Sequence, residues 1–487
     1  MSSIRNNIRN GVIWSGVLAG SRIGLQFLST IILAHLLSPD DYGLMGMLAV
    51  FIAVSETLMD AGMGGALIRK KDASSIDFGT LTTYNMVVSI ILYAIIFFLA
   101  PKVAIFYQRP ILANLMRIYG VVLIIEAVSI VPRVQLMRSL QFRKYAMIGL
   151  IAGFVSLIVA IVSALLGYGV YSLLWQILLS SLISSAMMMF YTNYRISFYF
   201  SIQSFRSLFG FGINTTLGNL IKNFAENIFT NVVGKFAPLH LTGYYNQGFK
   251  LQNIVASIQT TIIDNALFSV LSKEESGRIV DISARINYLA AYIAVYLYAL
   301  LILNSTLIVD LMLGEQWLGM VPYLKLLLVG GIFQSFTAFN RNIFKTLAET
   351  FSIVLSELIS ISVVLFLIIT VEFGVIAIIY TFIGYTFFRW QISVILLSYK
   401  KHFMYMDYMR KMLGVIVPTL LLLAIFCAID LSENAMIDGM ISSVLLTIVI
   451  AINGMLTRNN EYIEIESLLR SFIKGIINIT RNKLLSK

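Results

Sequence analysis

The sequence predicts an all-α integral membrane protein with about fourteen transmembrane helices. Of its 487 residues, 59% are hydrophobic and 12% are charged, whereas about a quarter of the residues in an ordinary soluble domain are charged. Apolar runs long enough to cross the hydrocarbon recur along the whole chain, and the connections between them are mostly shorter than the runs. This pattern leaves no segment for a separate soluble domain.

The apolar runs define the predicted spans in order. The first run, 11–37, follows Arg5 and Arg9 as the core of a signal peptide would, but it is too long for one and contains Arg22. We therefore interpret it as a span that is retained. The spans after it are expected at 42–67, 79–100, 112–131, 145–166, 169–192, 207–236, 242–271, 284–313, 320–340, 350–371, 373–397, 412–430 and 437–456.

Positive charges are distributed unevenly among the connections. If the N-terminus is cytoplasmic, the connections on its side carry most of the lysines and arginines, including Arg341 and Lys345, whereas the other side carries only Lys102, Arg109 and Lys235. By the positive-inside rule both termini are cytoplasmic, and this bias accounts for most of the net charge of +11. A nucleic-acid binder would cluster its basic residues on one face, so no nucleic-acid partner is expected.

Two short segments recur at an offset of about 200 residues: 38–43 resembles 237–243, and 168–175 resembles 373–380. We interpret the chain as two pseudo-symmetric six-helix lobes followed by a terminal pair of helices. Because each lobe has an even number of spans, the repeats are parallel, and transporters with such repeats place the substrate path between the halves. The predicted units are lobes at 1–206 and 207–400, a terminal pair at 401–457, and a cytoplasmic amphipathic tail at 458–487 on the membrane surface.

Polar residues inside the spans are informative, because a charge at membrane depth costs about 2.5–3.5 kcal/mol on insertion scales. Spans 207–236 and 242–271 each carry a polar stripe at helical spacing, so two neighbouring helices are expected to turn polar faces to a common space. At the repeat offset, Arg22 corresponds to Lys222 and Gln26 to Glu226. The candidate substrate-binding residues are Arg22, Gln26, Asn219, Lys222, Asn223, Glu226, Asn227, Lys250 and Asn253.

Two interpretations of these charges are open at this point. In the first, Arg22 and Lys222 line a cavity for an anionic ligand, since both side chains supply charge and hydrogen-bond donors to phosphate. In the second, Lys222 pairs with Glu226, and Arg22 pairs with Glu56 or Asp60, so that ion pairs hold the bundles together. The run of asparagines favours the cavity, because structural pairing does not require it.

Buried carboxyls form a second group of candidates, since burial favours their protonated form and lets them exchange a proton or a cation. Glu56, Asp60 and Asp264 are candidates for ion coupling, whereas Glu357 and Arg389 are interpreted as structural or near-interface residues. The three histidines lack ligand spacing, so no metal site is expected. The sequence has no P-loop, HExxH or G-x-S-x-G motif, so we expect no ATP motor, no enzyme and no cofactor.

Three segments carry a resemblance to a known family. Residues 11–16 (Gly-Val-Ile-Trp-Ser-Gly), 36–43 (Leu-Leu-Ser-Pro-Asp-Asp-Tyr-Gly) and 60–68 (Asp-Ala-Gly-Met-Gly-Gly-Ala-Leu-Ile) resemble polysaccharide transporters of the Wzx flippase type. That family belongs to a superfamily that also contains multidrug and toxic-compound extruders and the lipid II flippase. The resemblance extends over essentially the whole chain.

The resemblance implies a flippase of the bacterial inner membrane that moves an oligosaccharide linked to undecaprenyl diphosphate by alternating access between the lobes. Such transport serves the synthesis of lipopolysaccharide O-antigen, capsule or exopolysaccharide, with a polysaccharide polymerase and chain-length proteins as partners. The resemblance also implies a cationic central cavity, which Arg22 and Lys222 match, with Lys250 as a third candidate.

Two other functions are compatible with the span count. A multidrug extruder of the same fold would exchange a drug for H⁺ or Na⁺, but a cationic drug favours an acidic cavity rather than one with Arg22 and Lys222. A glycan polymerase or ligase would need a long periplasmic loop, and every outer connection here is short.

Overall fold

The computed structural model of the chain describes residues 20, 24–271, 279–347, 349–400, 404–428, 439 and 441–448. Within these residues the regular structure is helical, without a β-strand. Nine of the described helical runs are long and apolar enough to cross a membrane, or ten if a pair joined by a 68° bend is one span. The predicted all-α, membrane-spanning class is confirmed, while the count of fourteen stays a prediction.

The described helices follow the order of the predicted spans. Before them lies the short apolar helix Gly24–Leu36. The helices that follow are α2 (Pro39–Asp60), α3 (Met63–Arg69), α4 (Ser75–Tyr107), α5 (Ile111–Arg138), α6 (Phe142–Leu165), α7 (Val170–Thr192), α8 (Ile202–Phe236), α9 (Leu239–Leu271), α10 (Ile279–Leu303), α11 (Ser305–Leu313), α12 (Val321–Thr346), α13 (Thr350–Ser360), α14 (Leu367–Thr370), α15 (Val375–Tyr399) and α16 (Tyr405–Ala428).

Three predicted spans differ from one straight helix, the first being 42–67, which is divided between α2 and α3. The span expected at 284–313 is bent by 68° between α10 and α11. The span expected at 350–371 consists of α13 and α14 with short 3₁₀ segments between and after them. The last span, 437–456, overlaps the described residues only at 439 and 441–448, and the predicted tail at 458–487 lies outside them.

Local sequence explains where α2 begins and ends. The Ser38 hydroxyl accepts a hydrogen bond from the Asp41 backbone N–H (3.3 Å), and the Asp41 carboxylate accepts one from the Ser38 N–H (3.0 Å), which is a reciprocal capping box with Pro39 in the first turn. At the other end, Ala61 and Gly62 both have left-handed backbone angles, φ 45° and 68°. They stop α2 and start α3 in a new direction.

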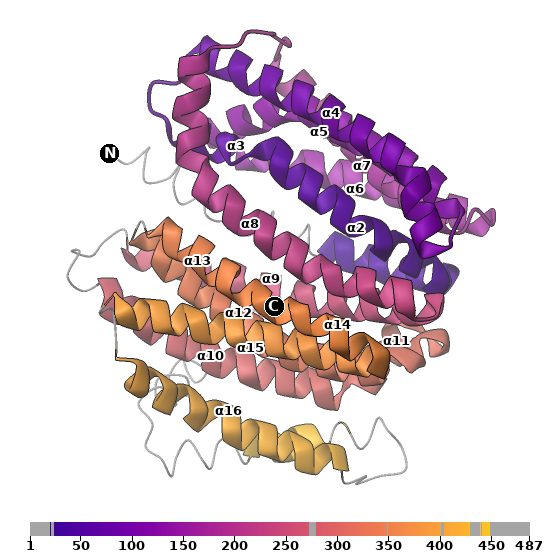
Figure 1. The fold of residues 1–487 in the computed structure, drawn as a ribbon, viewed down its shortest axis with the longest axis vertical. Helices are drawn as coiled ribbons and strands as arrows, with labels where there is room; N and C mark the ends of the chain where they lie inside the picture. The colour runs from indigo at the N-terminus through magenta and orange to yellow at the C-terminus, as the bar shows by residue number, and fades with distance from the viewer. Residues whose placement is uncertain are drawn as a thin grey trace, which may run out of the picture.

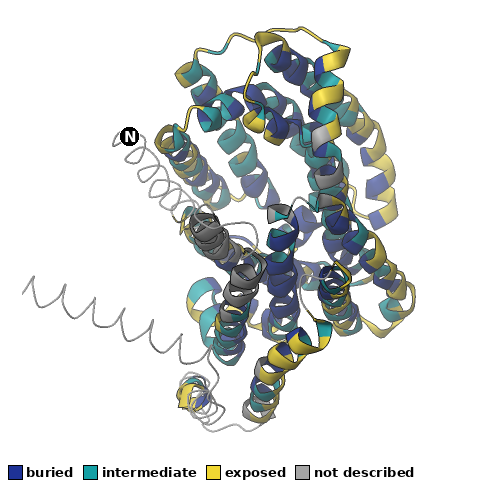
Figure 2. Ribbon diagram, turned by 90° about the vertical axis from the view of Figure 1, so that its left-hand side faces the viewer, coloured by how far each residue is buried: buried dark blue, intermediate teal, exposed yellow. Residues whose placement is uncertain are grey.

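The exposed surface is apolar, as lipid contact requires. Large hydrophobic side chains such as Phe98, Ile105 and Phe190 are among the most exposed residues of the described chain. Figure 2 shows buried positions gathered where helices meet and exposed positions on the outer faces. Soluble monomers seldom expose apolar surface on this scale, whereas hydrocarbon accommodates it.

The helices form two neighbouring groups (Figure 1). In the first group α4, α5, α6 and α7 pack together, and α2 packs on α5 and α4. In the second group α12 packs on α9, α10 and α15, and α13 packs on α15 and α8. Helix α2 also packs on α8 and α9, so these three helices form the boundary between the groups. The division into lobes at residue 206 stays a proposal.

Glycines bring α2 against the second group at both of its ends. We call the end where α2 begins the Ser38 end, and the end where α3 finishes the Arg69 end. At the Ser38 end, a Cβ on Gly243 would lie 1.9 Å from the Pro39 carbonyl oxygen, and one on Gly43 would lie 2.6 Å from that of Leu239. At the Arg69 end, a Cβ on Gly212 would lie 2.8 Å from the Ala61 carbonyl oxygen. Only glycine permits such close backbone approach.

Gly243→Ala should destabilise the protein, because the added Cβ overlaps backbone atoms that cannot rotate away. We expect a lower melting temperature of the purified protein in detergent, equivalent to about 1–3 kcal/mol. The matched control is Gly149→Ala in α6, where a Cβ would meet nothing within 4 Å and alanine favours the helix by about 1 kcal/mol. An unchanged melting temperature for Gly243→Ala would show that the α2 to α9 contact is loose.

Candidate functional site

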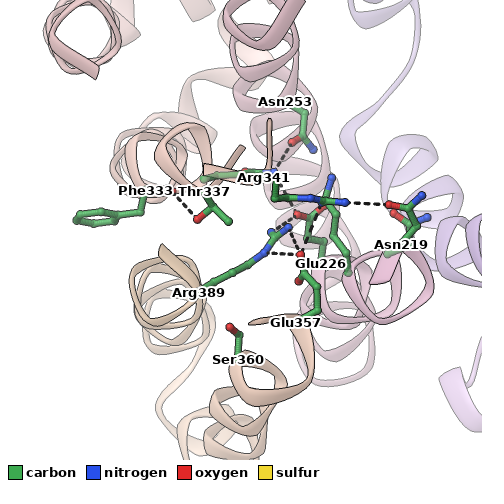
Figure 3. A network of polar contacts seen from close by, with 12 residues as sticks. Asn219, Glu226, Asn253, Phe333, Thr337, Arg341, Glu357, Ser360 and Arg389 are labelled. Carbon is green, nitrogen blue, oxygen red and sulfur yellow. Dashed lines mark hydrogen bonds and ion pairs between the residues drawn. The ribbon is translucent and has the colours of Figure 1, made fainter. Parts of the chain in front are cut away.

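Five charged side chains of the described chain meet where α8, α12, α13 and α15 pack together, and Figure 3 labels four of them. We call them the five-charge cluster. Two are carboxylates and three are cations, and each of the four helices contributes at least one of them. The members are Lys222 and Glu226 of α8, Arg341 of α12, Glu357 of α13 and Arg389 of α15.

Arg389 is the buried centre of the cluster. Its Nε and Nη2 donate to Glu357 Oε1 at 3.0 and 2.7 Å, and its Nη1 donates to Glu226 Oε1 at 2.9 Å. The Arg389 and Glu357 side chains are almost completely buried. Charge-assisted bonds of this length compensate the desolvation of buried ions. One guanidinium therefore hydrogen-bonds to two carboxylates from two different helices.

Arg341 is held less closely by carboxylates than Arg389 is. Its Nη2 donates to Asn219 Oδ1 of α8 at 3.0 Å, while its Nη1 lies 3.6 Å from Glu357 Oε1, beyond hydrogen-bond distance. Arg341 and Lys345 lie on α12, which continues to Thr346, beyond the predicted span end at 340, and their placement on the cytoplasmic side stays a prediction. The end of this helix was predicted from the end of its apolar run. Arg341 lies beyond that run and is stabilised by Asn219 of α8 and Glu357 of α13.

Amide side chains extend the cluster toward α9. Gln334 Nε2 donates to Glu226 Oε1 at 3.2 Å and lies 3.3 Å from Asn253 Oδ1, which also accepts from it. Gln252 Nε2 donates to Gln334 Oε1 at 2.9 Å. Buried amides connected in this way fix one another's orientation. Asn253, a predicted site residue, is thus linked to Glu226 through one glutamine.

Lys222 lies at the exposed side of the cluster. Its Nζ is 3.8 Å from Glu226 Oε2, an ion pair without a hydrogen bond, while Glu226 Oε1 is occupied by Arg389. The expected pairing of Lys222 with Glu226 therefore exists in a loose form. Lys250 lies elsewhere on the boundary, with its Nζ 5.3 Å from the centre of the Tyr42 ring of α2.

The asparagine stripe of α8 contacts the first helix group. Asn223 Nδ2 donates to Thr57 Oγ1 of α2 at 2.9 Å, and Asn231 Oδ1 accepts from the Tyr107 hydroxyl of α4 at 2.6 Å. Asn227 Nδ2 donates to the Asn223 carbonyl of its own helix at 2.8 Å. The stripe thus lies at the boundary between the two groups, with some of its members bonded across that boundary.

The candidates Glu56 and Asp60 lie on α2 in the first helix group, close in sequence to Thr57. Asp60 Oδ2 accepts from the Gly62 N–H at 3.3 Å. Arg133 of α5 interacts electrostatically with Asp60 and Glu56 and lies 3.8 Å from Glu126 Oε2. Among the described residues, three carboxylates and one arginine therefore gather between α2 and α5.

Three predicted site residues remain: Gln26, Arg22 and Asp264. Gln26 is exposed on the helix Gly24–Leu36. Arg22 lies outside the described residues, and Asp264 belongs to α9 but its side chain is not among those described. Within the described chain, no group of three or more histidine, cysteine, aspartate or glutamate residues could hold a metal ion.

Sequence reasoning did not assign Arg341, Glu357 and Arg389 to the site. A signal for two of them was present, because Glu357 and Arg389 each lie inside a predicted apolar span, where an ion needs a partner. What the sequence did not contain was the packing of α13 and α15 against α8, which turns two isolated charges into a cluster with Glu226.

A family model described as polysaccharide biosynthesis protein matches residues 32–322, more than half of the chain. The chain is similar to the teichuronic acid biosynthesis protein TuaB of Bacillus subtilis (strain 168), with 23% identity over 343 residues covering 68% of this chain and 70% of that protein. It is also similar to the lipopolysaccharide biosynthesis protein WzxC of Escherichia coli (strain K12), with 24% identity over 353 residues and 68% of each covered.

Among solved structures, the fold is similar to that of the lipid II flippase MurJ in its inward closed conformation. The TM-score is 0.70 at 14% sequence identity, with 92% of this chain and 99% of that chain covered. At this identity the likeness concerns the fold alone.

Asn223→Ala should weaken the contact between α8 and α2, because it removes the hydrogen bond to Thr57. We expect a fall in the melting temperature of the detergent-purified protein equivalent to about 0.5–1.5 kcal/mol. Asn227→Ala is the matched control, since the amide of Asn227 donates to its own helix. If both variants melted at the same temperature, the bond between Asn223 and Thr57 would contribute nothing to the boundary.

Proposed function

Because this chain belongs to the polysaccharide biosynthesis protein family, we propose that it is a flippase, which moves an oligosaccharide linked to undecaprenyl diphosphate across the bacterial inner membrane. The observation that carries the proposal is the excess of cations in the five-charge cluster, next to the boundary between two helix groups. Relatives that act in polysaccharide biosynthesis and a fold like that of a lipid II flippase support it.

The chemistry of such a substrate suits this arrangement. A diphosphate carries negative charge that hydrocarbon rejects, and arginine or lysine can supply charge and donors in its place. Sugar hydroxyls need hydrogen bonds, which the asparagines of α8 can supply, while the polyprenyl tail stays in lipid. We therefore propose that the protein is a transporter rather than an enzyme, and that it uses no cofactor.

Alternating access would use the boundary formed by α2, α8 and α9. In this structure the two groups are in contact at both ends of α2. At the Ser38 end Gly43 lies against Gly243, and at the Arg69 end Gly62, in the turn after α2, lies against Gly212. We propose that the lobes 1–206 and 207–400 separate at one of these ends at a time. The polar stripe between the two contacts would then face the substrate.

The proposed substrate site keeps the residues expected from the sequence. Asn219, Lys222, Glu226 and Asn253 are supported by their place in or beside the five-charge cluster. Arg22, Gln26, Asn223, Asn227 and Lys250 are proposed on their position in the stripes and in the repeat.

Glu56, Asp60 and Asp264 are proposed for ion coupling. The excess of carboxylates around Arg133 supports the first two, because a buried excess of negative charge is suited to a proton or a cation. A multidrug extruder with the same fold would need such an acidic region as its substrate site. The cation excess of the five-charge cluster favours an anionic lipid instead.

Removing the charges of Arg22 and Lys222 together should abolish transport, because the diphosphate would lose both symmetry-related cations. In a strain that depends on this protein, Arg22→Gln with Lys222→Gln should abolish surface polysaccharide and accumulate the lipid-linked precursor. Protein level and membrane insertion are verified by immunoblotting of membranes. Normal surface polysaccharide in the double variant would refute the paired-cation site.

The orientation can be tested with cysteines at the two ends of α4. In a Cys427→Ser background, Arg109→Cys should react with a membrane-impermeant maleimide in intact spheroplasts, because the Ser38 end is proposed to be periplasmic. Lys71→Cys should react only after permeabilisation. Both positions are exposed in the structure, so they form a matched pair. The reverse labelling pattern would invert the proposed topology.

A further inference from the structure

The five-charge cluster is graded from its buried to its exposed side. The exposed fraction of the side chain is 2% for Arg389, 12% for Arg341 and 30% for Lys222. Glu357 is fully buried, and Glu226 is 10% exposed. Three cations face two carboxylates, so the cluster has one positive charge in excess, and its accessible members are Lys222 and Arg341.

The carboxylates are bound chiefly to the least accessible cation. Among the described residues, each hydrogen bond from a cluster cation to Glu226 or Glu357 comes from Arg389, at 2.7 to 3.0 Å. The competing ion pairs are longer, 3.8 Å from Lys222 to Glu226 and 3.6 Å from Arg341 to Glu357. The charges of Lys222 and Arg341 are therefore only weakly compensated by the neighbouring carboxylates.

Arg341 also retains capacity for another partner. Its Nε is buried without a hydrogen-bond acceptor among the described residues, and its Nη2 bonds to the neutral Asn219. A phosphate oxygen is the kind of acceptor that a guanidinium binds most strongly. Lys222 on the neighbouring helix can supply a second charge to the same group.

We infer that Arg389 is a positioning residue that gives the site its preference for anions, by occupying Glu226 and Glu357 and so leaving Lys222 and Arg341 for a phosphate group of the substrate. This inference rests on the proposed function and adds the residue that sets its charge selectivity. Arg389 does not touch the substrate.

Loss of the Arg389 side chain would free Glu226 and Glu357 to pair with the two other cations of the cluster. Glu226 is one helical turn from Lys222, and Glu357 already approaches Arg341, so small side-chain rotations close both ion pairs. The accessible cations are then neutralised within the protein. The positive excess falls from one charge to zero, and a phosphate must displace a carboxylate in order to bind.

The test compares two lipids on the purified full-length protein in nanodiscs. The probes are undecaprenyl diphosphate and undecaprenol, which share the tail and differ in the anionic group, and the readout is the ratio of their dissociation constants. Arg389→Gln should lower the preference for the diphosphate by about tenfold or more. A general loss of packing would weaken both lipids and leave the ratio unchanged.

A rescue variant separates positioning from direct contact. Arg389→Gln combined with Glu226→Gln and Glu357→Gln removes the carboxylates that Arg389 occupies, so the preference for the diphosphate should return. This variant carries no unpaired buried charge at the three positions, so it keeps the proposal testable if Arg389→Gln alone does not fold. Arg117→Gln in α5, remote from the cluster in sequence and bonded to Phe97 of α4, is the control and should keep the ratio.

Two results would overturn the role of Arg389: a full diphosphate preference in Arg389→Gln, or a folded triple variant in which the preference does not return. Equal affinity of the unaltered protein for the two lipids would overturn the anion site, and with it the proposed function. The two failures are therefore distinguishable.

Discussion

The structure depends on the compensation of buried charge by Arg389. An ion inside a membrane protein is tolerated only when its partners replace water, and the Arg389 guanidinium does so for Glu226 and Glu357 with three short hydrogen bonds. Because the partners belong to α8, α13 and α15, this interaction also fixes how these three helices face one another. Moving α13 or α15 alone would separate Glu357 from Arg389, so these two helices are expected to move together.

The boundary between the two helix groups is built on a different principle. Its described polar contacts include neutral pairs, Asn223 with Thr57 and Asn231 with Tyr107. A neutral hydrogen bond contributes about 0.5–1.5 kcal/mol net, and either partner can bond to water or a sugar hydroxyl once separated. Ion pairs therefore hold the second group together, while bonds that exchange easily line the surface at which the proposed lobes separate.

How much the sequence predicts depends on whether a feature is local. Helix positions follow from apolar runs, and the start of α2 follows from Ser38, Pro39 and Asp41, so these were predictable. The end of α12 was not, because Arg341 is stabilised by Asn219 and Glu357 from distant parts of the chain. The stripe of α8 was visible in the sequence, but which of its members bond across the boundary depends on packing. The symmetry between Arg22 and Lys222 stays a prediction.

The glycines at the two ends of α2 explain how such a boundary can be both close and separable. Gly43 and Gly243 are 200 positions apart, close to the offset of the predicted repeat, and each packs against the backbone at the start of the other's helix. Small residues let membrane helices approach closely without interlocking side chains. A contact of this kind excludes solvent and lipid while it is closed, yet its opening requires no large side chain to leave a pocket. Because the five-charge cluster lies among α8, α12, α13 and α15, the proposed opening at either end of α2 would break backbone packing and neutral hydrogen bonds, and would leave the charges of that cluster compensated.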